Sequence, residues 1–555
     1  MIAKTSRVPD RRRISEPCLD AALVLAALAS SPAALAQTDS AYFLPNKLMV
    51  SRVVYDNNPN NVVAGVTQLP PNCAPANCVT ATDDGTYPYV WNNALVDGSF
   101  GITAKIILDQ LTPSGSLLNS LEVPNSSQDG VRPTKDQMVG SFSSKSELAL
   151  NLSIDGQYFT FMGYLASINA LDVSNSNTPG VIDPTNPVPG ANYRVVAQLD
   201  RRGKFRFTKT NAYSGNNGRA AILNDSNGTN VLYAAGNAGN GGNPQPDGII
   251  IGAGAQILTP QIKALVAQRP GLPTPVGSFS IVQLGDKPDK IGKDTNFRGL
   301  KIFNDVLYYT KGSGGNGVNT VYFVDTSGFG VNGTPLACPN GSGVPAASVS
   351  LPTAPLPYDP SVLQTAGLIP NNMCILNGFP TALNSTTSFP FGVWFADADT
   401  LYVADEGNGT NTFDPKTGTY TAAAAQTTAG LQKWMFDGTT WTLAYTLTAG
   451  LDLGLPYTVS GDPTGNNSAT NLPWSPATDG LRNITGRNNG DGTATIWAIT
   501  STVSGNGDQG ADPNKLVMIT DTLANTTLPS TGGFSTVRTA GFGETLRGVS
   551  FTPRR

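Results

Sequence analysis

The sequence contains no histidine and little charge, since Asp, Glu, Lys and Arg make up 13% of its 555 residues, against about 25% in an ordinary soluble domain. Without histidine, Ser-His-Asp triads, Cys-His pairs, a His general base and His-ligated metal sites are all excluded. The 60 Gly and 41 Pro residues argue against long helices. Hydrophobic residues still make up 39%, which is enough for a sizeable core. The composition therefore indicates a globular, helix-poor protein with few catalytic options.

Residues 1–36 have the features of a bacterial Sec-type signal peptide. Basic residues gather between positions 4 and 13, Ala21–Ala29 is apolar, and Ala34–Ala36 matches the small-x-small cleavage pattern. A membrane anchor is the alternative, but Ser30 and the residues after it end the apolar run far short of the roughly 20 residues that a span needs. We therefore expect cleavage after Ala36, a secreted or periplasmic protein, and no membrane span in the mature chain.

The chain from residue 37 onward is expected to be acidic overall, with 30 basic and 36 acidic side chains. No Lys/Arg cluster is expected in it, so nucleic acid is not an expected partner, because neutralising phosphates requires a basic face.

Four cysteines remain after the signal segment, and in an exported chain an even number favours disulfides. Of the three possible connectivities, the local one is favoured, because each pair then lies within one Pro/Asn-rich segment; a zinc site is the alternative. The predicted bridges are Cys73–Cys78 and Cys338–Cys374.

Short apolar or alternating runs, separated by Asn, Gly, Asp and Pro, predict β-strands throughout the mature chain. One pattern recurs, in which an Arg or Phe begins a β-run that is followed by a turn and a second run. Four strands per repeat is typical of a β-propeller blade. The full copies begin at Arg219–Ile222, Phe297–Ile302, Phe391–Phe395 and Leu481–Ile484, and the last, Leu546–Phe551, has no second half.

This orphan run at the C-terminus predicts how the propeller closes. We expect Leu546–Phe551 to join N-terminal runs such as Lys47–Val54 in one shared blade. Together with a blade over about 148–208 and the four later repeats, this favours six blades, with seven as the alternative. Residues 37–555 are thus predicted to form a single all-β domain with long loop insertions, the longest being Val331–Ser388, which holds Cys338 and Cys374.

The segment Leu401–Gly409 (LYVADEGNG), followed by Gly430–Gly438 (GLQKWMFDG), resembles the rhythm of NHL-type six-bladed propellers. The ending Leu546–Pro553 (LRGVSFTP) resembles that of exported bacterial propeller proteins of unassigned function, and the resemblance runs from about Phe297 to the end. This resemblance implies a six-bladed propeller fold. Its relatives include gluconolactonase-like enzymes, which hold a divalent metal in the central channel with Glu, Asn and Asp, and many non-catalytic modules. Those ligands do not match residues of this chain one by one, so they are not assigned.

In a propeller, the inner strands line a central channel. Four arginines occupy equivalent positions at the start of these strands, and their planar guanidiniums could clamp an anion. The structural alternative is that each arginine binds a carboxylate or carbonyl and ties blades together. The candidate site residues are Arg219, Arg298, Arg482 and Arg547, together with the carboxylates Asp405, Glu406 and Glu544.

The favoured function is therefore an exported, non-catalytic propeller that binds a ligand or partner through its loop face and channel. The ligand could be a small anion, a carbohydrate or a protein, with no cofactor required. The alternative is a Ca²⁺-dependent hydrolase, lactonase- or phosphoesterase-like, that works with Asp, Glu and Arg.

Overall fold

Short antiparallel strands make up most of the computed structural model, as the alternating apolar runs predict. It describes residues 42–82, 101–142, 147–182, 186, 188–237, 254–261, 296–312, 318–326, 342–345, 350–353, 373–382, 387–506 and 509–554. Residues 41–555 form one compact unit. The predicted signal segment, residues 1–36, lies outside the described residues. None of the helices in the described part of the chain has the length and apolar character needed to cross a membrane.

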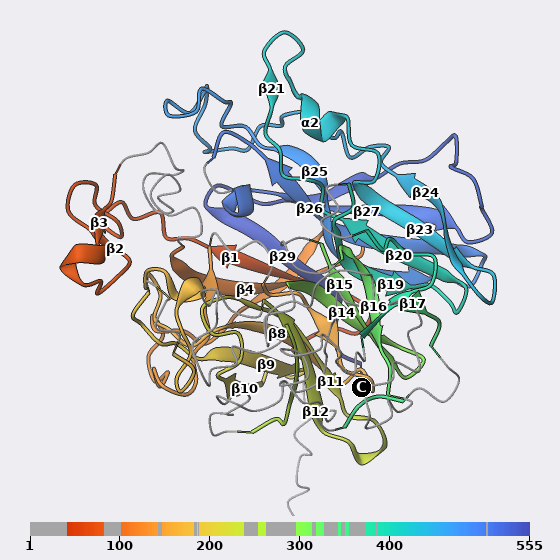
Figure 1. The fold of residues 1–555 in the computed structure, drawn as a ribbon, viewed down its shortest axis with the longest axis horizontal. Helices are drawn as coiled ribbons and strands as arrows, with labels where there is room; N and C mark the ends of the chain where they lie inside the picture. Colours follow the sequence, from red (N-terminus) through yellow and green to blue (C-terminus); the bar gives the residue numbers. More distant parts are fainter. Residues whose placement is uncertain are drawn as a thin grey trace, which may run out of the picture. The chain divides into compact units, whose positions relative to one another are not determined.

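Six sheets form the blades of a six-bladed β-propeller, which confirms the predicted fold class (Figure 1). Blade 1, from the inner strand outward, consists of β29 (Glu544–Phe551), β1 (Leu48–Val54), β4 (Thr103–Leu111) and β5 (Leu117–Glu122), with β6 (Gly140–Ser141) beside β4. Blade 2 consists of β7 (Asn151–Leu152), β8 (Tyr158–Tyr164), β9 (Arg194–Asp200) and β10 (Phe205–Thr210). Blade 3 consists of β11 (Gly218–Asn224), β12 (Val231–Gly236) and β13 (Ala255–Leu258).

The C-terminal half of the chain supplies the other three blades. Blade 4 consists of β14 (Phe297–Phe303), β15 (Val306–Lys311), β16 (Thr320–Val324), β18 (Met373–Leu376) and β17 (Ser342–Gly343). Blade 5 consists of β19 (Pro390–Phe395), β20 (Thr400–Asp405), β23 (Gly430–Phe436) and β24 (Trp441–Leu447). Blade 6 consists of β25 (Ala477–Asn488), β26 (Thr493–Val503), β27 (Lys515–Thr522) and β28 (Ser535–Thr539).

The two ends of the described chain meet in blade 1, as predicted. Strand β1 pairs antiparallel with β29 on one side and with β4 on the other, and Val50 lies opposite Val549. Figure 1 shows this as the red-brown β1 lying against the blue β29. Because Val50 and Val549 are at most 1% exposed, this pairing buries apolar side chains as well as satisfying the backbone of both strands.

The six inner strands touch one another in a closed order: β29, β7, β11, β14, β19, β25 and back to β29. Small residues permit this approach, since a Cβ on Gly299 or on Gly392 would lie 2.6 Å from a carbonyl oxygen of the next inner strand. Hydroxyl groups then connect neighbouring blades. Ser51 accepts a hydrogen bond from the Gly548 N–H and donates one to the Leu148 carbonyl oxygen, both at 2.8 Å.

The connections between strands carry the remaining elements. They are β2 (Gln68–Leu69), η1 (Pro75–Asn77), β3 (Val79–Thr80), η2 (Val173–Asn175), η3 (Ser226–Gly228), β21 (Phe413–Asp414), β22 (Thr419–Tyr420), α2 (Thr421–Ala424) and η6 (Gln509–Ala511). The predicted Cys73–Cys78 disulfide is confirmed. Cys338 lies outside the described residues, so the second predicted bridge does too.

The predicted insertion, residues 331–388, contains an element that the sequence analysis assigned to loop. Strand β18 pairs with β16 and completes blade 4, and each of its four residues is at most 1% exposed. The short run Met-Cys-Ile-Leu follows a Pro- and Gly-rich stretch, which is why the pattern around it favoured a loop.

Candidate functional site

The four inner-strand arginines lie on the strands that the repeat pattern predicts. Arg219 and Arg298 are the second residues of β11 and β14, Arg482 lies within β25, and Arg547 lies within β29. Each is at most 5% exposed. A buried guanidinium is costly unless it is hydrogen-bonded or paired with a negative charge. The hydrogen-bond and ion-pair partners of these arginines therefore determine whether they can bind a ligand.

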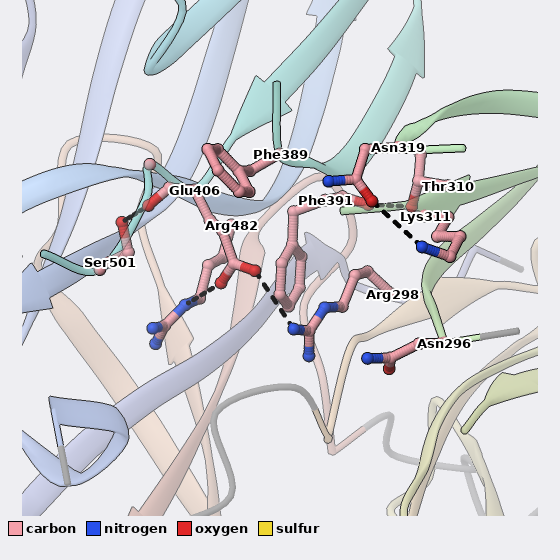
Figure 2. Close-up of polar contacts among 12 residues, drawn as sticks. Asn296, Arg298, Thr310, Lys311, Asn319, Phe389, Phe391, Glu406, Arg482 and Ser501 are labelled. Atoms are coloured by element: carbon pink, nitrogen blue, oxygen red, sulfur yellow. Dashed lines mark hydrogen bonds and ion pairs between the residues drawn. The ribbon is translucent and has the colours of Figure 1, made fainter. Parts of the chain in front are cut away.

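Glu406 joins two of these arginines. Its Oε1 lies 3.5 Å from Nη2 of Arg298, and its Oε2 lies 3.2 Å from Nε of Arg482. Figure 2 shows the carboxylate between the two guanidiniums, with the Phe391 side chain beside Arg298. Glu406 follows β20 in blade 5, so this one side chain connects blades 4, 5 and 6.

The backbone of Glu406 is fixed as firmly as its side chain. Its N–H donates to the Phe389 carbonyl oxygen at 3.0 Å, and its own carbonyl oxygen accepts from the Ser501 hydroxyl at 2.6 Å. The backbone that carries the carboxylate is therefore anchored to blades 5 and 6.

Arg219 has no carboxylate partner among the described residues. Its Nη1 donates to Oδ1 of Asn296 and, at 2.9 Å, to the carbonyl oxygen of Phe297, and its buried Nε has no hydrogen-bond partner. Burial lowers the pKa of Arg219 well below its usual value, and the positive charge of Arg298 lowers it further. The pKa of Arg298 is also lowered, chiefly by burial; Glu406 opposes the shift and Arg482 adds to it.

Arg547 donates from Nη2 to the carbonyl oxygen of Phe142, at the end of the segment that carries β6. Like Arg219, it therefore donates to a neutral backbone oxygen, in this case within blade 1.

Asp405 and Asp479 lie beside Glu406 and carry raised pKa values. Burial raises the pKa of Asp405 to about 6, although the N–H groups of Phe389 and Gly407 donate to its oxygens at 2.8 and 3.0 Å and oppose the shift. Burial raises the pKa of Asp479 to about 7; the Gly409 N–H opposes it, and the charge of Glu406 reinforces it. Both carboxyl groups therefore take up protons close to neutral pH.

The structure places Glu544, the remaining predicted site residue, in a different set of contacts. Glu544 pairs with Arg52, and the Oε2 of Glu544 accepts a hydrogen bond from the Gly541 N–H at 3.2 Å. Arg52 also lies 2.9 Å from Asp109. These contacts connect β29 to β1 and β4 within blade 1, whereas Glu406 connects different blades. The sequence analysis listed Glu544 as a carboxylate that could pair with one of the four arginines; in the structure its described partner is Arg52.

The sequence analysis did not single out several buried charged residues, among them Lys311 and Glu147. Lys311, fully buried at the end of β15, lies opposite Phe297 and donates to Oδ1 of Asn319 at 3.1 Å (Figure 2). Glu147, also fully buried, accepts from the Tyr164 hydroxyl at 2.7 Å. The position of Lys311 at the end of an apolar strand was a sequence signal for a buried lysine. Glu147 lies in a stretch with no comparable pattern.

No group of three or more Asp, Glu or Cys side chains in the described part of the chain is arranged to hold a metal ion. The Ca²⁺-dependent alternative stays a prediction.

Raised carboxyl pKa values give the protein a testable dependence of stability on pH. Because Asp405 and Asp479 have folded-state pKa values of about 6 and 7 against 3.8 ordinarily, the folded protein holds protons that the unfolded chain has released. The free energy of unfolding should therefore fall as the pH rises from about 4 to about 7, by a few kcal/mol in total.

Urea unfolding at several pH values measures this effect. The substitutions Asp405→Asn and Asp479→Asn should flatten the slope. A free energy of unfolding that rises steadily across this pH range would contradict the assignment.

These features define an all-β, six-bladed propeller with arginines buried at one end of its inner strands. No protein-family model matches the sequence, and the search of curated proteins also finds no match. Among solved structures, the chain is similar to a mutant of the Synechocystis apocarotenoid oxygenase (ACO), with a TM-score of 0.22 and 9% identity over 82% of this chain and 59% of that one. The chain thus spans less than two thirds of that structure, and a similarity this weak carries no argument about activity.

Proposed function

We propose that the protein is an exported, non-catalytic propeller that binds a small anion at the inner-strand arginines. The observation that carries the proposal is a group of buried guanidiniums around one carboxylate: Arg298 and Arg482 both pair with Glu406. Within the described part of the chain, buried Arg219 lies close enough to Arg298 for the two charges to repel, and its hydrogen bonds go to neutral oxygens. The signal segment supports export. The rhythm of blade 5 supports kinship with NHL-type propellers.

An oxyanion suits this arrangement chemically. Guanidinium groups bind carboxylate, sulfate and phosphate through paired N–H donors. The Nε of Arg219 is a buried donor without a partner, and an electrostatic attraction is stronger in a buried site than in water. A bound anion would also relieve the repulsion between Arg219 and Arg298, which shows in the lowered pKa of Arg219.

Sulfate is a suitable probe, because it stays doubly charged across the working pH range. Isothermal titration calorimetry should show that Arg219→Ala weakens sulfate binding about tenfold, since a hydrogen bond to a charged group is lost. Arg487→Ala is the matched control: Arg487 lies on β25, as Arg482 does, but is exposed.

The same measurement at two pH values tests the role of the carboxyl groups. Affinity for sulfate should be several-fold higher at pH 5 than at pH 8, because protonation of Asp405 and Asp479 removes negative charge beside the arginines. If Arg219→Ala fails to fold, Arg219→Lys, which keeps the charge but loses the planar fork, takes its place. Sulfate binding that is unchanged in both variants would contradict the proposal.

A further inference from the structure

A second group of cations lies on blade 2, in a pocket of about 270 Å³. We call it the hairpin pocket, because four of its cationic side chains belong to the hairpin between β9 and β10. Its charged lining residues are Arg201, Arg202, Lys204, Arg206, Arg554 and Asp200. The expectation that no Lys/Arg cluster remains after the signal segment is therefore wrong at this hairpin.

The carboxylate that lines the pocket accepts hydrogen bonds from the backbone of the hairpin turn. Asp200 ends β9, and its Oδ1 accepts the N–H groups of Arg202 and Lys204 at 2.9 and 3.0 Å. Gly203, between them, has a φ of +79°, which a residue with a side chain rarely adopts. The turn therefore points consecutive cations outward from one tight loop while its carboxylate caps the backbone.

The fifth cation comes from the other end of the chain. The N–H of Arg554 donates to the Gly156 carbonyl oxygen at 2.7 Å, in the turn between β7 and β8. This contact fixes the C-terminal segment against blade 2 and adds the Arg554 side chain to the hairpin cations. A pocket assembled from positions about 350 residues apart is not a by-product of one basic stretch of sequence.

Four of the five cations of the pocket have no ion-pair partner within the described residues. Within the described part of the chain, Arg201, Lys204, Arg206 and Arg554 make no ion pair, and the Arg206 guanidinium lies instead 5.8 Å from the centre of the Tyr158 ring. These four cations share a small volume and repel one another. This gathering stands out in a chain with a formal net charge of −4.

We propose that the hairpin pocket binds a compact polyanion that carries phosphate or sulfate groups, such as the pyrophosphate group of a small molecule. Arginine and lysine side chains provide the donors that such groups need. The concave shape and small volume favour a compact group over an extended polyanion, which would need a longer basic face. The site is separate from the inner-strand arginines: the contacts described above for those arginines involve no residue of the hairpin pocket.

Pyrophosphate is the probe for this site, titrated into the full-length chain carrying Arg219→Ala, so that the inner-strand site contributes little. We expect one molecule to bind, and Arg206→Ala and Arg554→Ala each to weaken binding about tenfold. Binding should also weaken as salt is raised to about 0.5 M, because exposed charges are screened. Arg487→Ala, which removes another exposed arginine, should leave pyrophosphate binding unchanged.

Because the side chains of Arg206, Arg487 and Arg554 are exposed, these substitutions are expected to leave folding unchanged. If the buried Arg219→Ala substitution prevents folding, the same three substitutions are compared in the chain that retains Arg219. Absence of pyrophosphate binding at low salt, or binding that Arg206→Ala and Arg554→Ala leave unchanged, would overturn the proposal. Vesicles containing anionic phospholipid form the second arm: binding to vesicles without binding to free pyrophosphate would also overturn it and reassign the patch to a membrane surface. Failure of sulfate binding at the inner-strand arginines would leave this result unaffected, so the two proposals fail separately.

Discussion

Removal of residues 544–555 should abolish cooperative folding of the propeller. Strand β29 is the inner strand of blade 1 and also touches β25 of blade 6 and β7 of blade 2. Its Leu546 and Val549 side chains are 1% exposed. Without β29, the core around them opens, β1 loses one pairing edge, and two further blades lose a neighbour. The loss should exceed the 5–15 kcal/mol or so that ordinarily stabilises a folded domain.

Near-ultraviolet circular dichroism and urea unfolding measure this outcome: we expect no fixed aromatic signal and no single sharp transition. The control is a chain that ends at Thr552. It keeps β29 and the hydrogen bond from the Thr552 N–H to the Lys47 carbonyl oxygen at 2.9 Å, so its stability should stay close to that of the full chain, although it lacks Arg554 of the hairpin pocket. Cooperative unfolding of the shorter chain, ending at Gly543, would show that closure through β29 is dispensable.

The closure itself was predictable from the sequence, because a repeat that stops after one strand leaves a pairing edge that must be satisfied. Strand patterns are local, and Lys47–Val54 and Leu546–Phe551 both carry them clearly. Strand β18 was not predictable in the same way. Its four apolar residues are too few to show a period, and its place in blade 4 depends on a long connection returning to β16.

The positions of the candidate site residues followed from the repeat, whereas their partners did not. The blade fixes where Arg298 and Arg482 lie, but their common carboxylate, Glu406, comes from the second strand of the blade between them. Such a contact depends on the packing of three blades and leaves no spacing signal. The hairpin pocket was missed for a related reason: charge was considered along the chain, while Arg554 reaches the hairpin only through the fold.

Replacement of Glu406 by Gln should destabilise the protein by about 3–5 kcal/mol, because removing one member of a buried ionic group leaves its partners uncompensated. Here two guanidiniums, Arg298 and Arg482, each about 5% exposed on the side chain, lose their shared carboxylate together. The free energy of unfolding in urea measures the effect. A loss below about 1 kcal/mol would mean that the pairs behave like exposed ones.

A triple variant separates charge compensation from packing at this site. Replacing Arg298 and Arg482 by Met and Glu406 by Leu removes the entire ionic group, and such replacements of buried ion networks by apolar side chains are often neutral or stabilising. It should therefore recover most of the stability lost by Glu406→Gln while binding sulfate more weakly at the inner-strand arginines. If the triple variant does not recover this stability, the loss in Glu406→Gln arises from packing around the glutamate side chain and not from uncompensated charge.

The single variant Glu406→Ala connects stability to the proposed function. It leaves two buried guanidiniums facing the space of the missing carboxylate, and a small carboxylate from solution can occupy that space. Acetate should therefore raise the melting temperature of Glu406→Ala more than that of the unmodified protein, since a ligand that binds only the folded state stabilises it. The same inner-strand arginines would then be shown to hold an external oxyanion in place of their own. An equal response of both proteins to acetate would contradict this.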